Sequence, residues 1–210
     1  MNSLPFPRPS KIVCVGRNYV DHAKELGNEV PKAPLLFFKP SSALVPPGAA
    51  IVLPQASQQV EYEAEIGILI GKALRNVDAA GAEAGIGGVT CANDVTARDL
   101  QKSDGQWARA KGFDTFCPVG PKVVTGLDWK SLTIIGRVNG VEKQRGTSSQ
   151  MVFPIPQLLS YISGIMTLEP GDLVLTGTPA GVGPLKPGDV VEVEIPGVGI
   201  LSNPVVAESR

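Results

Sequence analysis

The chain has 210 residues, of which 43% are hydrophobic and 19% charged, so it is not intrinsically disordered and fits one compact domain. Its 19 Lys and Arg against 20 Asp and Glu give a net charge of -1, so the basic excess of a nucleic-acid-binding protein is absent. No apolar run is long enough to span a bilayer, and the first ten residues lack the apolar core of a signal peptide. The cysteines, Cys14, Cys91 and Cys117, form no zinc pattern. We expect a cytoplasmic protein with no membrane or nucleic-acid partner.

In chain order, short apolar runs between Gly and Pro turns predict many strands and few helices. The predicted strands cover residues 11–15, 35–38, 51–53, 60–70, 88–95, 132–138, 141–144, 173–176, 189–195 and 199–202. The predicted helices cover residues 19–26, 78–84, 96–101 and 155–166. Asn139-Gly140 is the strongest hairpin signal. Because helices do not alternate regularly with the strands, we expect a strand-rich α+β domain rather than a doubly wound sheet.

Three glutamates, Glu61, Glu63 and Glu65, recur every second residue and therefore share one face of the predicted strand. No Lys or Arg alternates with them, and the strand continues as an apolar run that heads into a core. Two interpretations remain open. The glutamates form a solvated acidic face, or they supply oxygen ligands to a hard divalent cation.

Asp94 ends an apolar predicted strand, where a carboxylate needs a partner. It is the best candidate for a third oxygen ligand. The alternative is that it caps the helix predicted to follow. No suitable His or Cys stands beside these acids, which disfavours zinc and favours magnesium or manganese.

His22 is the only histidine, and Glu25 lies three residues later on the same face of the predicted helix. A carboxylate beside an imidazole orients the ring and raises its basicity, as a general base requires. The alternative is an exposed helix with an incidental His–Glu pair, and spacing alone favours that alternative.

Motifs spread in order along the chain resemble the fumarylacetoacetate hydrolase family. They are Gly16-Arg17-Asn18-Tyr19 with His22 and Glu25, Leu36-Phe37-Phe38-Lys39-Pro40, Glu63-Ala64-Glu65, Asp94-Val95-Thr96-Ala97-Arg98-Asp99, Trp107-Ala108-Arg109-Ala110-Lys111-Gly112-Phe113-Asp114, Cys117-Pro118, and Leu175-Thr176-Gly177-Thr178-Pro179 with Gly181-Val182-Gly183. The chain looks like the short, single-domain branch that contains acylpyruvate hydrolases and oxaloacetate decarboxylases. We expect an N-terminal extension at residues 1–10 and one catalytic domain at residues 11–210.

The resemblance implies a mixed β-roll with few short helices, assembled as a homodimer. It also implies that Glu63, Glu65 and Asp94 bind Mg²⁺ or Mn²⁺, and that Glu61 does not.

The resemblance further implies a catalytic dyad of His22 and Glu25 on a lid that orders over the substrate. Lys111 is implied to lie beside the metal, although a lone lysine at a helix end is usually a surface residue. The implied substrate contacts are Arg17, Gln101 and Thr178.

The expected substrate is a small oxo acid. A 2-oxo acid chelates a divalent metal, and breaking its C3–C4 bond leaves an enolate whose charge the metal stabilises. We expect a metal-dependent hydrolase of acylpyruvate-type (2,4-diketo) acids such as fumarylpyruvate or acetylpyruvate, with His22 activating the attacking water. The alternative is an oxaloacetate decarboxylase or keto–enol tautomerase that uses the same site. A non-catalytic metal-binding protein is disfavoured by the intact His22–Glu25 pair.

Overall fold

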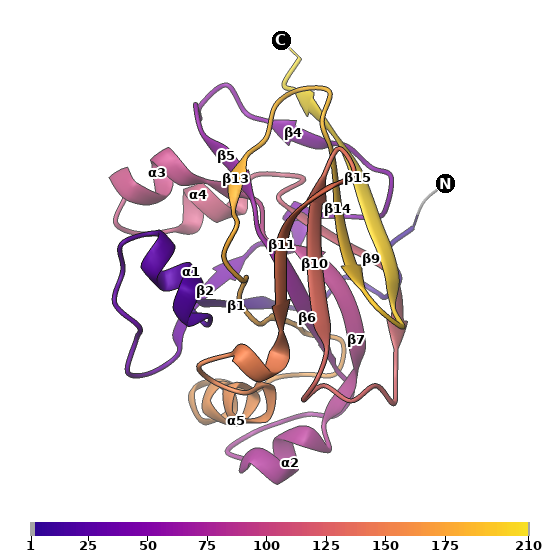
Figure 1. The fold of residues 1–210 in the computed structure, drawn as a ribbon. Coiled ribbons are helices and arrows are strands. Elements are labelled where there is room, and N and C mark those ends of the chain that lie inside the picture. The colour runs from indigo at the N-terminus through magenta and orange to yellow at the C-terminus, as the bar shows by residue number, and fades with distance from the viewer. Residues whose placement is uncertain (1–2, 210) are drawn as a thin grey trace.

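The computed structural model describes residues 3–209, which form three sheets flanked by short helices (Figure 1). The largest sheet has the order β2 (Leu35–Lys39), β1 (Ile12–Gly16), β12 (Leu173–Leu175), β6 (Ala64–Ile70), β7 (Ile86–Asn93), β9 (Cys117–Val124) and β3 (Leu44–Val45). The second has the order β11 (Val141–Thr147), β10 (Thr133–Val138), β14 (Val190–Ile195), β15 (Gly199–Ala207) and β4 (Ile51–Leu53). The smallest joins β13 (Gly183–Pro184), β5 (Val60–Tyr62) and β8 (Thr96–Ala97).

The helices are few and short. They are α1 (Val20–Glu25), α2 (Ala79–Glu83), α3 (Arg98–Ser103), α4 (Ala108–Gly112) and α5 (Ile155–Ile165), with 3-10 turns η1 (Ser41–Ala43) and η2 (Ser148–Gln150). β1 runs parallel to β12 and antiparallel to β2, so the sheet is mixed. The predicted strand-rich α+β class is therefore confirmed.

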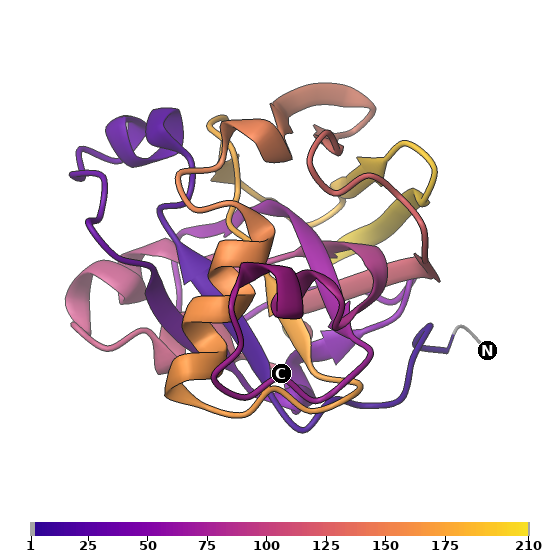
Figure 2. The ribbon, with the colours of Figure 1, turned by 90° about the horizontal axis from the view of Figure 1, so that it is seen from below.

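The main core lies where β10 and β14 pack against β6 and β7. β14 alternates buried residues with exposed or half-buried ones, so only one of its faces meets the core, whereas nearly every residue of β6 is buried. α5 closes one end of this core with Leu159 and Ile162, and α2 packs beside it (Figure 2). The three cysteines are buried and unpaired.

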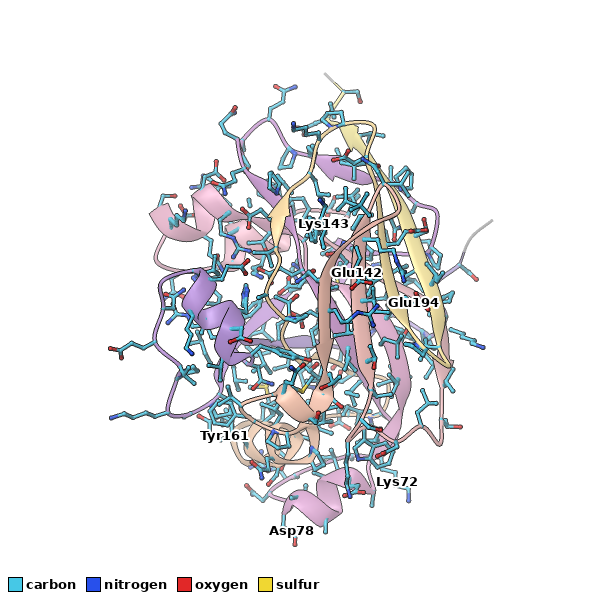
Figure 3. The ribbon with its side chains drawn as sticks, in the orientation of Figure 1. Lys72, Asp78, Glu142, Lys143, Tyr161 and Glu194 are labelled. Carbon is cyan, nitrogen blue, oxygen red and sulfur yellow. The ribbon has the colours of Figure 1, made fainter. Side chains whose placement is uncertain are left out.

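The predicted hairpin at Asn139-Gly140 and the helix predicted over residues 78–84 are both present. Asn139 and Gly140 join β10 to β11 with positive φ angles of 52° and 75°, as a tight hairpin turn requires. Asp78, labelled in Figure 3, caps α2, because its Oδ1 accepts a hydrogen bond from the Gly81 N–H at 2.8 Å.

Several predicted elements were wrong. The strand predicted over residues 60–70 is divided at Glu63 into β5 and β6, which belong to different sheets. The helix predicted over residues 96–101 begins as β8 and becomes helical only at Arg98. β9 was missed because Pro118 and Pro121 argue against a strand. Pro121 lies beyond the part of β9 that pairs with β3, at the place where the β7–β9 register shifts.

Within residues 3–209, no helix combines the length and the apolar character that crossing a membrane would require.

Candidate active site and metal centre

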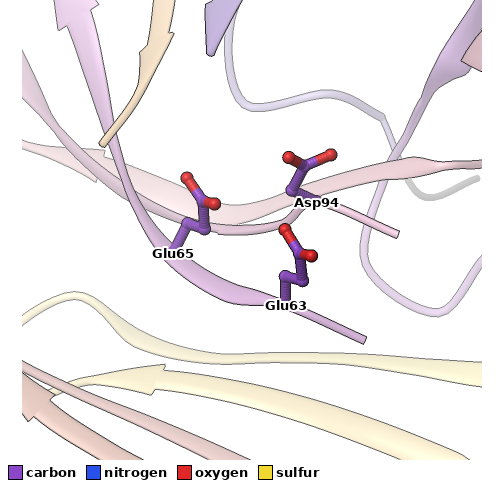
Figure 4. A group of neighbouring side chains, drawn as sticks. All are labelled: Glu63, Glu65 and Asp94. Atoms are coloured by element: carbon purple, nitrogen blue, oxygen red, sulfur yellow. The ribbon is translucent and has the colours of Figure 1, made fainter. Parts of the chain in front are cut away.

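Three buried carboxylates, Glu63, Glu65 and Asp94, meet beside the junction of β5 and β6 (Figure 4). The Glu63 N–H donates to Asn93 Oδ1 at 3.0 Å, and the Glu63 carbonyl accepts from the Asp94 N–H at 2.9 Å. One carboxylate oxygen from each of the three residues lies within 4.8 Å of the others. An oxygen-only donor set at this spacing fits a hard divalent cation.

Buried cations surround two of these carboxylates. Lys111 Nζ lies 2.8 Å from Glu63 Oε2 and 2.7 Å from Asp94 Oδ2. Arg98 Nη2 lies 2.5 Å from Glu63 Oε1, and Lys39 Nζ lies 2.5 Å from Asp94 Oδ1. These pairs offset much of the cost of burying the carboxylates. Lys111 is 2% exposed, so the interpretation as a surface lysine is wrong.

Glu65 differs from its two neighbours. The Gly177 N–H donates to its Oε2 at 2.7 Å, and no ion pair to Glu65 forms within residues 3–209. Burial, followed by the charges of Asp94 and Glu63, raises the pKa of Glu65 well above its usual range. Burial also opposes ionisation of Glu63, but Lys111 and Arg98 outweigh it and lower its pKa. Glu65 thus lacks the positively charged partner that Glu63 and Asp94 have, and a bound divalent cation would supply that positive charge.

The solvated acidic face considered from the sequence is wrong, because Glu61, Glu63 and Glu65 are only 6%, 5% and 2% exposed. Glu61 lies outside the cluster. Its Oε2 accepts from Arg98 Nε at 2.8 Å and its Oε1 accepts from Gln59 Nε2 at 2.6 Å.

Capping by Asp94 is also wrong. α3 begins only at Arg98, and its N-cap residue, Ala97, receives no side-chain hydrogen bond.

A narrow cavity of about 50 Å³ adjoins the carboxylates. Most of the predicted site residues line it, namely Arg17, His22, Glu63, Glu65, Gln101, Lys111 and Thr178. Apolar side chains complete the lining, among them Val15, Leu26, Phe37 and Trp107. Asp94 is not among the lining residues and is fully buried. The structure therefore brings together residues that are far apart in the sequence.

His22 is only 4% exposed and lines this cavity, so the interpretation of His22 as a residue of an exposed helix face is wrong. Its Nδ1 lies 3.4 Å from Glu25 Oε2. The Gly181 N–H donates to both carboxylate oxygens of Glu25, at 3.0 and 3.2 Å. Glu25 thus bridges the imidazole ring and the loop at residues 176–183.

The three predicted substrate contacts come from different segments of the chain. Arg17 follows β1 in the left-handed region, with φ of 59°, a conformation that for a non-glycine residue often marks a functional site. Gln101 Oε1 accepts from Arg98 Nη1 at 2.5 Å, so its amide donors are left for other partners. The Thr178 hydroxyl donates to the Ala64 carbonyl at 2.8 Å.

Residues 11–206 match the family model described as fumarylacetoacetate (FAA) hydrolase C-terminal. The chain belongs to the fumarylacetoacetate hydrolase family. An uncharacterized protein of Methanocaldococcus jannaschii is 52% identical over 201 residues, which cover 96% of this chain and 85% of that protein. Human mitochondrial oxaloacetate tautomerase FAHD2A is 46% identical over 214 residues, which cover 96% of this chain and 68% of that protein. A solved structure of a 5-carboxymethyl-2-hydroxymuconate delta-isomerase from Mycobacterium smegmatis matches with a TM-score of 0.90 at 46% sequence identity. The match covers 97% of this chain and 81% of that one.

As a member of the fumarylacetoacetate hydrolase family, the chain is an enzyme, and its buried acidic cluster is suited to a divalent metal. Sequence reasoning missed two residues of this site, Lys39 and Arg98. Lys39 carries the same sequence signal as Asp94, since it is a charged residue at the end of an apolar strand. Arg98 carried a weaker signal, namely that the buried glutamates needed a cation from elsewhere in the chain.

Proposed function

We propose that this enzyme interconverts the keto and enol forms of oxaloacetate or of a closely similar 2-oxo dicarboxylic acid. The observation that carries the proposal is the placement of His22 and the acidic cluster on one narrow cavity. The human relative at 46% identity is named an oxaloacetate tautomerase, which supports the alternative that the sequence raised rather than acylpyruvate hydrolysis.

Glu63, Glu65 and Asp94 would hold Mg²⁺ or Mn²⁺. When bound, the cation supplies positive charge that stabilises the oxyanion developing on the substrate. Lys111 places a second positive charge beside the same carboxylates. Burial excludes water from around these charges, which strengthens their effect on the substrate.

Tautomerisation moves a proton between the carbon next to the keto group and the keto oxygen. We assign to His22 the removal and return of the proton at carbon, while the enolate oxygen takes up and releases its proton in exchange with solvent water. Glu25 faces Nδ1 at 3.4 Å, so Nε2 is the ring nitrogen available to the substrate. The Glu25 carboxylate stabilises the imidazolium that forms, and the Gly181 N–H fixes that carboxylate in turn.

The cavity favours a compact substrate. Its volume of about 50 Å³ is far below the roughly 300–1,000 Å³ of pockets that hold drug-sized ligands. Arg17 and the amide donors of Gln101 supply groups that bind carboxylate oxygens. A short dicarboxylic acid satisfies both conditions, whereas acetylpyruvate, which is of similar size, offers only one carboxylate.

Acylpyruvate hydrolysis is the second candidate, because the His22–Glu25 pair is equally suited to activating a water molecule. The test follows the loss of enol absorbance of oxaloacetate, and the release of pyruvate and carbon dioxide, with and without Mg²⁺. Acetylpyruvate is assayed in parallel for pyruvate and acetate. Faster keto–enol equilibration without pyruvate release is the expected result. Cleavage of acetylpyruvate alone would favour the second candidate, and no metal-dependent reaction of either acid would overturn both.

A further inference from the structure

The buried amide of Gln144 connects the acidic cluster to the loop at residues 176–183. Gln144 lies on β11 and is 1% exposed. Its Oε1 accepts from the Ala64 N–H at 2.9 Å, while its Nε2 donates to Thr178 Oγ1 at 2.8 Å and to the Pro179 carbonyl at 2.7 Å. Both amide donors and the amide oxygen are therefore used, which is the condition under which a buried polar group is stabilising.

Local backbone irregularities place this side chain. The β10–β11 register shifts between Gly136 and Arg137, which leaves Lys143 as an extra residue in β11. At Gly136, a Cβ atom would lie 3.0 Å from Gln144 Oε1, so glycine makes room for the amide. At Gly181, with φ of +102°, a Cβ atom would lie 2.0 Å from the Lys143 carbonyl oxygen. The bulge at Lys143 and the two glycines together leave the space that the Gln144 amide and the loop backbone occupy.

The Gln144 amide and the Thr178 hydroxyl together fix the backbone of Ala64. Ala64 lies between Glu63 and Glu65, and both of its backbone polar groups are bound by side chains. Gln144 accepts from its N–H, and the Thr178 hydroxyl donates to its carbonyl at 2.8 Å. Because Gln144 also donates to Thr178, the three residues form a closed ring of hydrogen bonds.

We propose that Gln144 is a positioning residue, which fixes the backbone between two metal-binding carboxylates and, through Thr178, the loop that faces the substrate. It does not line the cavity and acts through its hydrogen bonds to Ala64, Thr178 and Pro179. The parts of this inference that concern metal and substrate rest on the proposed function. Removing the groups that orient metal ligands typically weakens metal binding about 10–100-fold.

Three variants separate this role from general stabilisation. Gln144→Leu removes all three hydrogen bonds, and Gln144→Glu keeps the acceptor for Ala64 while losing the donors. The matched control is Asn203→Leu. Asn203 is also a buried amide of the same sheet, 1% exposed, and donates to two backbone carbonyls, those of Pro46 and Ala49, outside the cavity lining.

The first measurement is the calorimetric affinity of the substrate-free protein for Mn²⁺. The second is amide hydrogen exchange over residues 176–183 without metal. Gln144→Leu is expected to weaken Mn²⁺ binding about tenfold or more and to speed exchange at Gly177 and Gly181. Gln144→Glu should speed exchange with a smaller loss of affinity. Asn203→Leu should lower the melting temperature and leave both readouts unchanged.

Unchanged Mn²⁺ affinity in Gln144→Leu, or an equal loss in Asn203→Leu, would overturn the proposal. If the wild-type protein does not bind Mn²⁺, the proposed metal function fails. Amide hydrogen exchange then decides the role of Gln144 by itself, and wild-type protection of residues 176–183 in Gln144→Leu would overturn that role. If Gln144→Leu does not fold, Thr178→Val breaks the same ring with little change in volume and takes its place in both measurements.

Discussion

At the scale of single residues, His22 carries the proton in the proposed reaction, and Glu25 stabilises the imidazolium that forms. His22→Ala is expected to lower the tautomerisation rate by roughly 10²–10⁴, the usual contribution of a general base. Glu25→Gln should give a smaller loss, because an amide still orients the ring but does not stabilise its charge. The rates are measured at saturating Mg²⁺, with Mn²⁺ affinity as the control for an intact metal site. A wild-type rate in His22→Ala would show that the dyad is incidental.

Glu65 makes the stability of the metal-free protein depend on pH. Its pKa is raised in the folded state, so above its ordinary value of 4.5 the folded protein binds more protons than the unfolded chain. Stability should therefore fall as pH rises from about 5 toward the raised pKa. Glu63 has a lowered pKa, so its contribution is already complete in this range.

The test compares melting temperatures of the wild-type and Glu65→Gln proteins in a chelator across this pH range. The variant should lose the pH-dependent decline, and saturating Mn²⁺ should remove it from the wild-type protein. Parallel curves for the two chelated proteins would contradict the assignment. Glu65→Gln should also be inactive, because a ligand charge is gone.

At the scale of elements, the loop at residues 176–183 connects α1, β6 and β11. Gly181 occupies its tightest point, where the backbone is left-handed and a Cβ atom would meet the Lys143 carbonyl. Gly181→Ala should lower the free energy of unfolding by more than about 1 kcal/mol and displace the N–H that binds Glu25. The matched control is Gly188→Ala, where φ is +93° but nothing lies within 4 Å.

Denaturant unfolding and tautomerase rates are measured for the two glycine variants. Together they separate the effect of backbone strain, which both variants share, from displacement of the Gly181 N–H. Both variants should lose stability, but only Gly181→Ala should lose activity. An active Gly181→Ala protein would show that the Glu25–Gly181 contact does not support catalysis.

At the scale of the whole molecule, the homodimer implied by family resemblance remains a prediction. Large apolar side chains that a single chain leaves exposed include Phe38, Val141, Ile165 and Ile200, each about half exposed. Light scattering at micromolar concentration should give twice the chain mass of 22.0 kDa. A mass of 22.0 kDa would contradict the prediction.

The sequence by itself determined the strand-rich class, the Asn139-Gly140 hairpin and the family, because these depend on local periodicity, turn chemistry and the order of motifs. It also singled out the acidic cluster, since a carboxylate at the end of an apolar strand is an anomaly that needs no tertiary information. The site residues were gathered from the whole length of the chain by sheet pairing, which no local pattern encodes.

Only the tertiary structure decided how the charges are arranged. The period-two rule placed Glu61, Glu63 and Glu65 on one face of a continuous strand, but the chain changes sheets at Glu63 and turns Glu61 toward Arg98. Spacing favoured an exposed His22, yet α1 folds over the cavity and buries it. Partners such as Lys39 and Arg98 compensate a buried carboxylate only after long-range packing removes water, so their pairing could not be read from neighbours in the sequence.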